Sequence, residues 1–158
     1  MRFLTRKWAD GVYSDQQAGI IYGAYLEHLE ELLPDMPLGF RNWVRLGAGS
    51  GVRGAPLLSA RYDAPTGTFT LRLRPDLPPV LEARLCYLGA VKGSFDLEEL
   101  ERLIAGGESR CLFDEPDFGG DEDIWMHSIL LEPEGEFSIR FREFRFEVTL
   151  DPDWDEEE

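Results

Sequence analysis

The last long apolar segment, residues 136–150, constrains the fold more than any other part of the chain. Two sets of apolar residues alternate with polar ones in opposite phase: Phe137, Ile139 and Phe141, then Phe144, Phe146, Val148 and Leu150. Successive side chains of a strand point to opposite faces, so an unbroken strand would place half of these residues in water. A bulge or sharp bend at Arg142-Glu143 would return both sets to one core. The segment therefore predicts a bent strand in a strongly curved antiparallel sheet.

Five other segments have the composition and period of strands. Residues 68–74 alternate most regularly, and the turn formers of residues 63–67 join them to the preceding strand as a hairpin. The turn Pro133-Glu-Gly135 leads into the final strand. The predicted strands, besides the last, are 57–62, 68–74, 80–88, 109–113 and 124–131.

Helical patterns occupy the N-terminal part and one later segment. Ser14 and Gln17 have the spacing of a capping box, an apolar stripe of period three to four follows, and Pro34 ends the helix. A shorter helix is predicted over residues 38–46. Ser94 or Asp96 caps another that ends just before Gly106. Residues 2–8 are interpreted as an edge strand or an ordered arm.

Length and composition favour a single domain that needs no disulfide bond or structural metal ion for stability. The chain has 158 residues, and no apolar run approaches the roughly 20 residues that span a bilayer. The charged opening segment MRFLTRKWAD lacks the apolar region of a signal peptide. Cys86 and Cys111 lie in apolar contexts without CxxC spacing, which indicates two buried free thiols in a reducing cytoplasm. We therefore expect a cytoplasmic protein that does not bind membranes.

The net charge of −15 is concentrated in two segments. Residues 114–123 and residues 151–158 each hold six acidic residues and no basic one. Without those twelve acids, 19 acidic residues face 16 basic ones, so the rest of the chain is nearly neutral. Like charges favour solvated, flexible segments, and we interpret the first as a surface loop and the second as a tail. Such a surface disfavours nucleic acid as a partner and could bind a basic protein.

The segment LGAGSGVRG, residues 46–54, matches glycine fingerprints of nucleotide and S-adenosylmethionine loops. Such loops join a buried strand to a helix whose N-terminus faces the ligand. Here the preceding residues FRNWVRL are interrupted by charges, and the following residues lead into a strand. A linker between the helical part and the sheet is the favoured interpretation, with a nucleotide site as the alternative.

Metal and cofactor sites are not supported by the remaining motifs. The acidic segment 114–123 lacks the D-x-D-x-D-G spacing of a calcium loop. His28 and His127 have no third zinc ligand at a useful spacing. No serine has a G-x-S-x-G context. We therefore predict no cofactor, no metal and no catalytic residue.

Arginines recur at outward positions of the predicted strands: Arg72, Arg74, Arg84, Arg140, Arg142 and Arg145. Gathered on one face, they could bind an acidic partner or the acidic tail, although cross-strand pairing with Glu82, Glu143 and Glu147 is the favoured interpretation. If the curved sheet holds a small ligand, then His127, Arg84 and Glu82 are the candidate binding residues.

The chain opens with MRFLTRKW and closes its last hairpin with HSILLEPEGEFSIRFREFRFEV. These two segments resemble the ends of a family of small bacterial proteins of unknown function, in which lysine stands at the position of Arg6. The family's start is Met-x-Phe/Tyr-x-Thr-Lys-like, and its end is a hairpin with a Gly-Glu turn. The resemblance implies no activity and no site residues.

Together these patterns predict an α+β fold, with an N-terminal helical part packed on a curved, roughly six-stranded antiparallel sheet and one inserted helix. Residues 1–150 are expected to form one domain, with a helical part at 1–46, a sheet part at 57–150 and an acidic tail at 151–158. The leading functional hypothesis is a non-enzymatic protein-binding module of regulatory or immunity type. The alternative is a small-ligand binder or enzyme that uses the interior of the curved sheet. An exposed edge strand could also pair two copies into a homodimer.

Overall fold

The structure, a computed structural model, describes residues 1–47 and 53–154 and has the predicted α+β class. Its N-terminal part contains α1 (Arg6–Ala9), α2 (Asp15–Leu32), the 3-10 turn η1 (Leu33–Asp35) and α3 (Leu38–Gly47). The predicted capping box is present, since Ser14 Oγ accepts from the Gln17 amide and the Gln17 side chain accepts from the Ser14 amide. The expectation of a strand or arm over residues 2–8 is wrong in part, because Thr5 caps the short helix α1.

Seven strands follow, and they form two sheets in place of the single predicted sheet. The first sheet has the order β1 (Leu57–Asp63), β2 (Thr68–Leu73), β3 (Val80–Leu88) and β7 (Glu143–Leu150). The second has the order β4 (Arg110–Phe118), β5 (Trp125–Glu132) and β6 (Glu136–Phe141). Every pair of neighbouring strands is antiparallel, and α4 (Leu97–Ala105), capped by Asp96, connects β3 to β4.

The break in alternation at Arg142 is the point where the chain passes from one sheet to the other. β6 pairs with β5 in the three-stranded sheet, and β7 pairs with β3 in the four-stranded sheet. The Arg142 amide donates to the Leu88 carbonyl at 3.0 Å, which fixes the junction. Phe141 and Phe144 are both buried, as the phase change predicts. Farther along β7, however, Val148 and Leu150 are exposed because nothing in the described chain covers the end of that strand's inner face.

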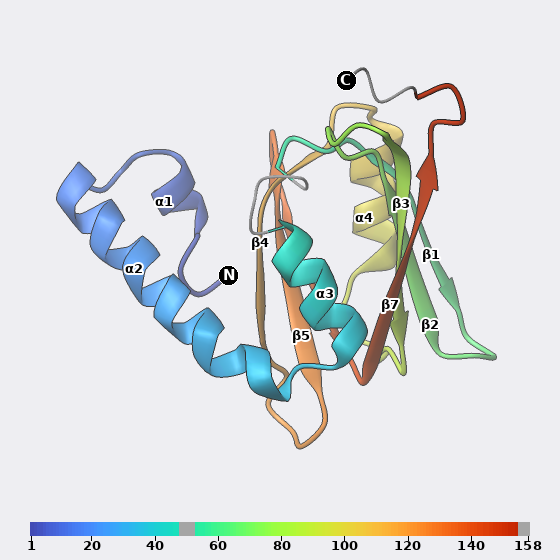
Figure 1. Ribbon diagram of the computed structural model, residues 1–158, viewed down its shortest axis with the longest axis horizontal. Helices are drawn as coiled ribbons and strands as arrows, with labels where there is room; N and C mark the ends of the chain where they lie inside the picture. Colours follow the sequence, from blue (N-terminus) through green and yellow to red (C-terminus); the bar gives the residue numbers. More distant parts are fainter. Residues whose placement is uncertain (48–52, 155–158) are drawn as a thin grey trace.

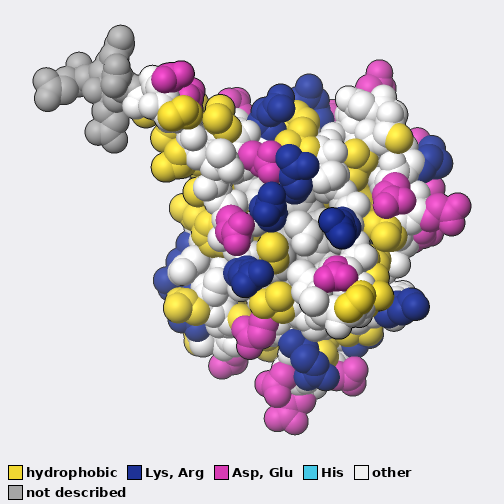
Figure 2. Space-filling model, turned by 90° about the vertical axis from the view of Figure 1, so that its right-hand side faces the viewer, with side chains coloured by type: hydrophobic (Ala, Val, Ile, Leu, Met, Phe, Trp, Pro, Cys, Tyr) yellow, Lys and Arg dark blue, Asp and Glu magenta, His cyan; other side chains and the backbone are white. Residues whose placement is uncertain are grey.

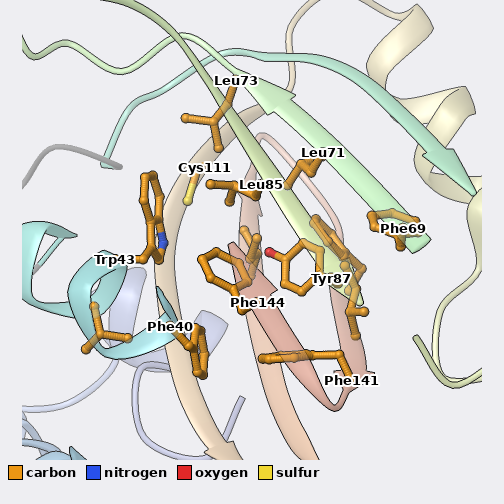
Figure 3. Close-up of a cluster of buried hydrophobic side chains, with 14 of the residues drawn as sticks. Phe40, Trp43, Phe69, Leu71, Leu73, Leu85, Tyr87, Cys111, Phe141 and Phe144 are labelled. Carbon is orange, nitrogen blue, oxygen red and sulfur yellow. The ribbon is translucent and has the colours of Figure 1, made fainter. Parts of the chain in front are cut away.

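The core lies between the two sheets, and aromatic rings dominate it (Figure 3). The Tyr87 ring packs edge-on against Phe141 and Phe144, with ring centroids 5.2 and 5.1 Å apart. Phe40 of α3 reaches the same two phenylalanines at 5.0 and 5.1 Å. Such edge-to-face contacts add to the stabilisation that comes from burial of apolar area.

Helices close the two open sides of this core. α3 lies between β4 and β7 (Figure 1), and Gly39 packs so tightly on β7 that a Cβ there would overlap the Phe144 carbonyl oxygen. α4 packs against β1 on the other side. α2, with α1 folded back on it, lies on the far side of β4 from the four-stranded sheet (Figure 1). No helix in the described ranges is long and apolar enough to cross a bilayer.

Candidate functional site

The three predicted ligand-binding residues do not share one site, because His127 lies on the opposite face of the four-stranded sheet from Glu82 and Arg84. Glu82 and Arg84 point outward from β3, in the same phase as each other. Tyr87 has the opposite phase, is fully buried, and its hydroxyl is hydrogen-bonded to His127 Nδ1 at 2.7 Å. His127 therefore lies in the core, on the opposite side of the sheet from Glu82 and Arg84. The histidine is also fully buried and not at the margin of the core.

His127 is the centre of a buried chain of hydrogen bonds. Its Nε2 lies 2.7 Å from Asp114 Oδ2, and its ring packs edge-on against Phe40 at 5.4 Å. A neutral imidazole with its proton on Nε2 satisfies both partners, since Nδ1 then accepts from Tyr87. Burial raises the pKa of the Tyr87 phenol well above its ordinary value, with a smaller contribution from the Asp114 charge. Neither Tyr87 nor His127 is accessible to a substrate, so these hydrogen bonds hold core side chains in place.

The acidic segment 114–123 is not the solvated loop that its composition indicates. Its first five residues belong to β4, and Glu115 is only 4% exposed. The Glu115 carboxylate accepts from the backbone amides of Arg2, Phe3 and Leu4 at 2.7–3.2 Å. A buried carboxylate is tolerated where several amides donate to it, so Glu115 fastens the N-terminal segment to β4.

Asp117 extends the same attachment to α2. Its Oδ1 lies 2.9 Å from His28 Nε2, and its Oδ2 lies 3.9 Å from the Arg2 guanidinium. Three of the six acidic residues in this segment therefore contact the protein's own N-terminal part or core, and Asp121, Glu122 and Asp123 remain exposed.

The outer face of the four-stranded sheet carries a broad polar concavity. We define the arginine face as the outward side chains of β1, β2, β3 and β7, with Arg61, Arg72, Arg84 and Arg145 as its cations. They surround a shallow hollow of about 840 Å³. Figure 2 looks onto this side of the molecule and shows Lys and Arg side chains gathered across its middle.

Strand register arranges these side chains in rows across the sheet. One row runs Arg61, Thr70, Cys86, Arg145, and the next runs Ser59, Arg72, Arg84, Glu147. Two rows of mainly polar side chains thus span four strands, and the buried Cys86 belongs to the first row.

Cross-strand pairing neutralises only part of the arginine face. Arg72 makes a two-point contact with Glu82, Nε to Oε1 at 2.6 Å and Nη2 to Oε2 at 2.7 Å. The hydrogen bond from Arg72 lowers the pKa of Glu82 below its ordinary value. Arg84 lies 3.8 Å from Glu147. Arg61 and Arg145 make no ion pair with any residue in the described ranges.

The other candidate sites from the sequence have less support as binding or catalytic sites. Cys86 and Cys111 are free, with Cys86 on the arginine face and Cys111 fully buried, where burial raises the pKa of its thiol. The glycine-rich segment of the nucleotide hypothesis falls largely on residues 48–52, which lie outside the described residues. Within residues 1–47 and 53–154, no group of three His, Cys, Asp or Glu could hold a metal ion.

Comparison with known proteins places the chain in no established family. No protein-family model, curated protein sequence or solved structure matches it.

Proposed function

We propose that this protein is a non-enzymatic protein-binding module of regulatory or immunity type, and that the arginine face binds an acidic surface of its partner. The observation that carries the proposal is the gathering of Arg61, Arg72, Arg84 and Arg145 on one face of a chain whose net charge is −15. Two of these arginines make no ion pair in the described structure, so their hydrogen-bonding capacity is free for carboxylates of another molecule.

The breadth of the arginine face favours a protein over a small ligand. Neighbouring strands lie about 4.8 Å apart, so β1 and β7 are separated by roughly 14 Å. Arginine is enriched in protein interfaces, where its planar guanidinium binds carboxylates at two points. The interior between the sheets, by contrast, is occupied by the aromatic core in the described residues, which gives the alternative of an interior ligand less support.

The expected basic partner has less support than the acidic one. Asp114, Glu115 and Asp117 contact His127, the N-terminal amides and His28, respectively. Among the acidic residues of that segment, Asp121, Glu122 and Asp123 are exposed, and Asp121 already lies 3.2 Å from Arg140 Nη2.

The test compares two variants with the same change in charge. Arg61→Glu with Arg145→Glu reverses two cations on the arginine face, and Lys7→Glu with Lys92→Glu reverses two exposed cations elsewhere. Each purified protein is used for affinity capture from nuclease-treated lysate of the source cells, with quantitative mass spectrometry. We expect an acidic protein that wild type and the lysine variant retain and the arginine variant loses. Equal capture by all three proteins, or capture abolished by nuclease, would reject the proposal.

A further inference from the structure

A small cavity lies between α2, α3 and β4, on the opposite side of the molecule from the arginine face. Its volume is about 60 Å³. Its walls are apolar or aromatic, and Asp114 is its single charged residue. The complete lining is Tyr22, Tyr25, Leu26, Leu29, Val44, Asp114 and Pro116.

Asp114 places a carboxylate in this cavity, with no arginine or lysine paired to it in the described ranges. Its side chain is 23% exposed, and its Oδ2 is held by His127 Nε2 at 2.7 Å. No arginine or lysine in the described ranges forms an ion pair with Asp114, and its Oδ1 accepts no hydrogen bond there. The cavity therefore offers a carboxylate oxygen without a donor in a partly desolvated setting, where charge interactions are strong.

The two tyrosines form neutral aromatic walls around that charge. The rings of Tyr22 and Tyr25 lie 6.2 Å apart at 44°. Burial, followed by the charges of Asp114 and Glu115, raises the pKa of the Tyr25 phenol, which keeps this wall uncharged. Aromatic faces attract cations, so the carboxylate and the rings favour the same kind of ligand.

The size of the cavity narrows the choice of cation. A cavity this small favours a compact cationic head, and an ammonium group is more compact than a planar guanidinium. Tyr22 and Leu26, four residues apart on α2, are 43% and 42% exposed at the rim and can cover the remaining methylenes of a stem.

We propose that this cavity binds a primary alkylammonium group, carried by a lysine side chain of a partner protein. The lysine source is favoured over a free amine because the exposed apolar rim offers contact area to the polypeptide around the lysine. This site is independent of the arginine face, and neither depends on the other being correct.

Methyl NMR of the wild-type protein tests the proposal directly. The methyl groups of Leu26, Leu29 and Val44 line the cavity and report its occupation. The probes are n-butylammonium, n-butylguanidinium and n-butanol, each titrated at constant ionic strength. We expect saturable shifts at these methyls with n-butylammonium and weaker binding of the other two. Shifts no larger than those from sodium chloride, or equal binding of n-butanol, would overturn the proposal.

Asp114→Asn removes the charge and keeps an oxygen that can accept from His127. We expect n-butylammonium to bind this variant roughly tenfold more weakly, which corresponds to about 1.4 kcal/mol. The matched control is Glu98→Gln, an exposed residue of α4 outside the cavity, which should leave binding unchanged. Tyr22→Leu, at the exposed rim, provides a second variant that does not touch the buried chain and should also weaken binding. Equal affinity of wild type, Asp114→Asn and Tyr22→Leu would contradict the site.

The source of the ammonium group is tested with a capped Gly-Lys-Gly peptide. If a protein lysine is the ligand, the peptide should bind more tightly than n-butylammonium, and Leu26→Ala should reduce that advantage. A peptide that binds no more tightly than the free amine would overturn the assignment to a protein lysine.

Discussion

β4 and the arginine face both carry dense charge, but the protein uses the two regions in opposite ways. On β4, Glu115 is 4% exposed and bonds to the backbone amides of the N-terminal segment. On the arginine face, Arg72 and Glu82 meet across neighbouring strands at the surface, and Arg61 makes no ion pair in the described chain. Burial decides the difference, since a charge withdrawn from water must be matched by fixed partners, whereas an exposed charge is already solvated. We therefore expect substitutions on β4 to alter folding, and substitutions on the arginine face to alter binding.

The largest effect is expected from Glu115→Gln. The variant removes the charge that three amides share and places an amide group against donors, so we expect a loss of about 3 kcal/mol in the free energy of unfolding. Urea denaturation measures this, and hydrogen exchange at the amides of Phe3 and Leu4 should accelerate. Glu122→Gln, exposed in the same acidic segment, should change stability by no more than about 0.5 kcal/mol. Equal effects of the two variants would mean that Glu115 does not hold the N-terminal segment.

Alkaline pH should weaken the same buried region. The pKa values of Tyr25 and Tyr87 are raised in the folded state, mainly by burial, so the unfolded chain releases these protons first as pH rises. Stability is therefore retained below the ordinary tyrosine pKa of about 10 and falls above it, by about 1.4 kcal/mol per pH unit for each phenol that stays protonated in the folded state.

Thermal unfolding between neutral and alkaline pH, followed together with tyrosine ionisation by ultraviolet absorbance, measures this loss. The double variant Tyr25→Phe with Tyr87→Phe should flatten the alkaline decline. Ionisation of both phenols without unfolding would contradict the prediction.

Tyr87→Phe tests the buried hydrogen-bond chain alone. Loss of the hydroxyl leaves His127 Nδ1 without its hydrogen-bond partner in a fully buried site, and we expect a cost of about 1.5 kcal/mol in thermal or urea unfolding. Tyr62→Phe is the matched control, because the half-buried Tyr62 hydroxyl makes no hydrogen bond with the described residues. A smaller effect at Tyr87 than at Tyr62 would show that the chain contributes little to stability.

The smallest effect on stability is expected for Arg72 and Glu82. A double-mutant cycle with Arg72→Gln and Glu82→Gln should give a coupling of about 0.5 kcal/mol that declines in high salt. Because the folded-state pKa of Glu82 is lowered, this contribution is present above the ordinary glutamate pKa and is lost as pH falls through the folded value. NMR titration of the Glu82 carboxyl should show its pKa rising in Arg72→Gln. An unchanged pKa would mean that the pair does not persist in solution.

Local patterns predicted most of the elements correctly because their causes are local. The Ser14 cap, the Asp96 cap and the alternation along β2 depend on residues a few positions apart. The break at Arg142 could also be predicted from the sequence, since two sets of apolar side chains in opposite phase need a break in the strand to share one core. The phase change did not reveal that the break joins two sheets, because the partners of β6 and β7 lie elsewhere in the chain.

The candidate sites were predicted less well, because they depend on contacts between distant residues. Glu82 and Arg84 alternate with Tyr87 along β3. This alternation could have predicted that they face away from Tyr87 and its partner His127. No sequence pattern links Asp114 to Tyr22 and Tyr25, which approach it only after α2 packs beside β4.

The amino-acid sequence by itself determined the helix caps, the strand periods, the position of the bend and the outward phase of the arginines. These features follow from hydrogen bonding and side-chain direction over a few residues. Only the tertiary structure decided which charges are buried. Glu115 and Glu122 are similar in sequence context, yet one bonds to amides 111–113 residues away and the other remains in water. The physical reason is that the free energy of a charge depends on the donors and the solvent around it, and long-range packing supplies both.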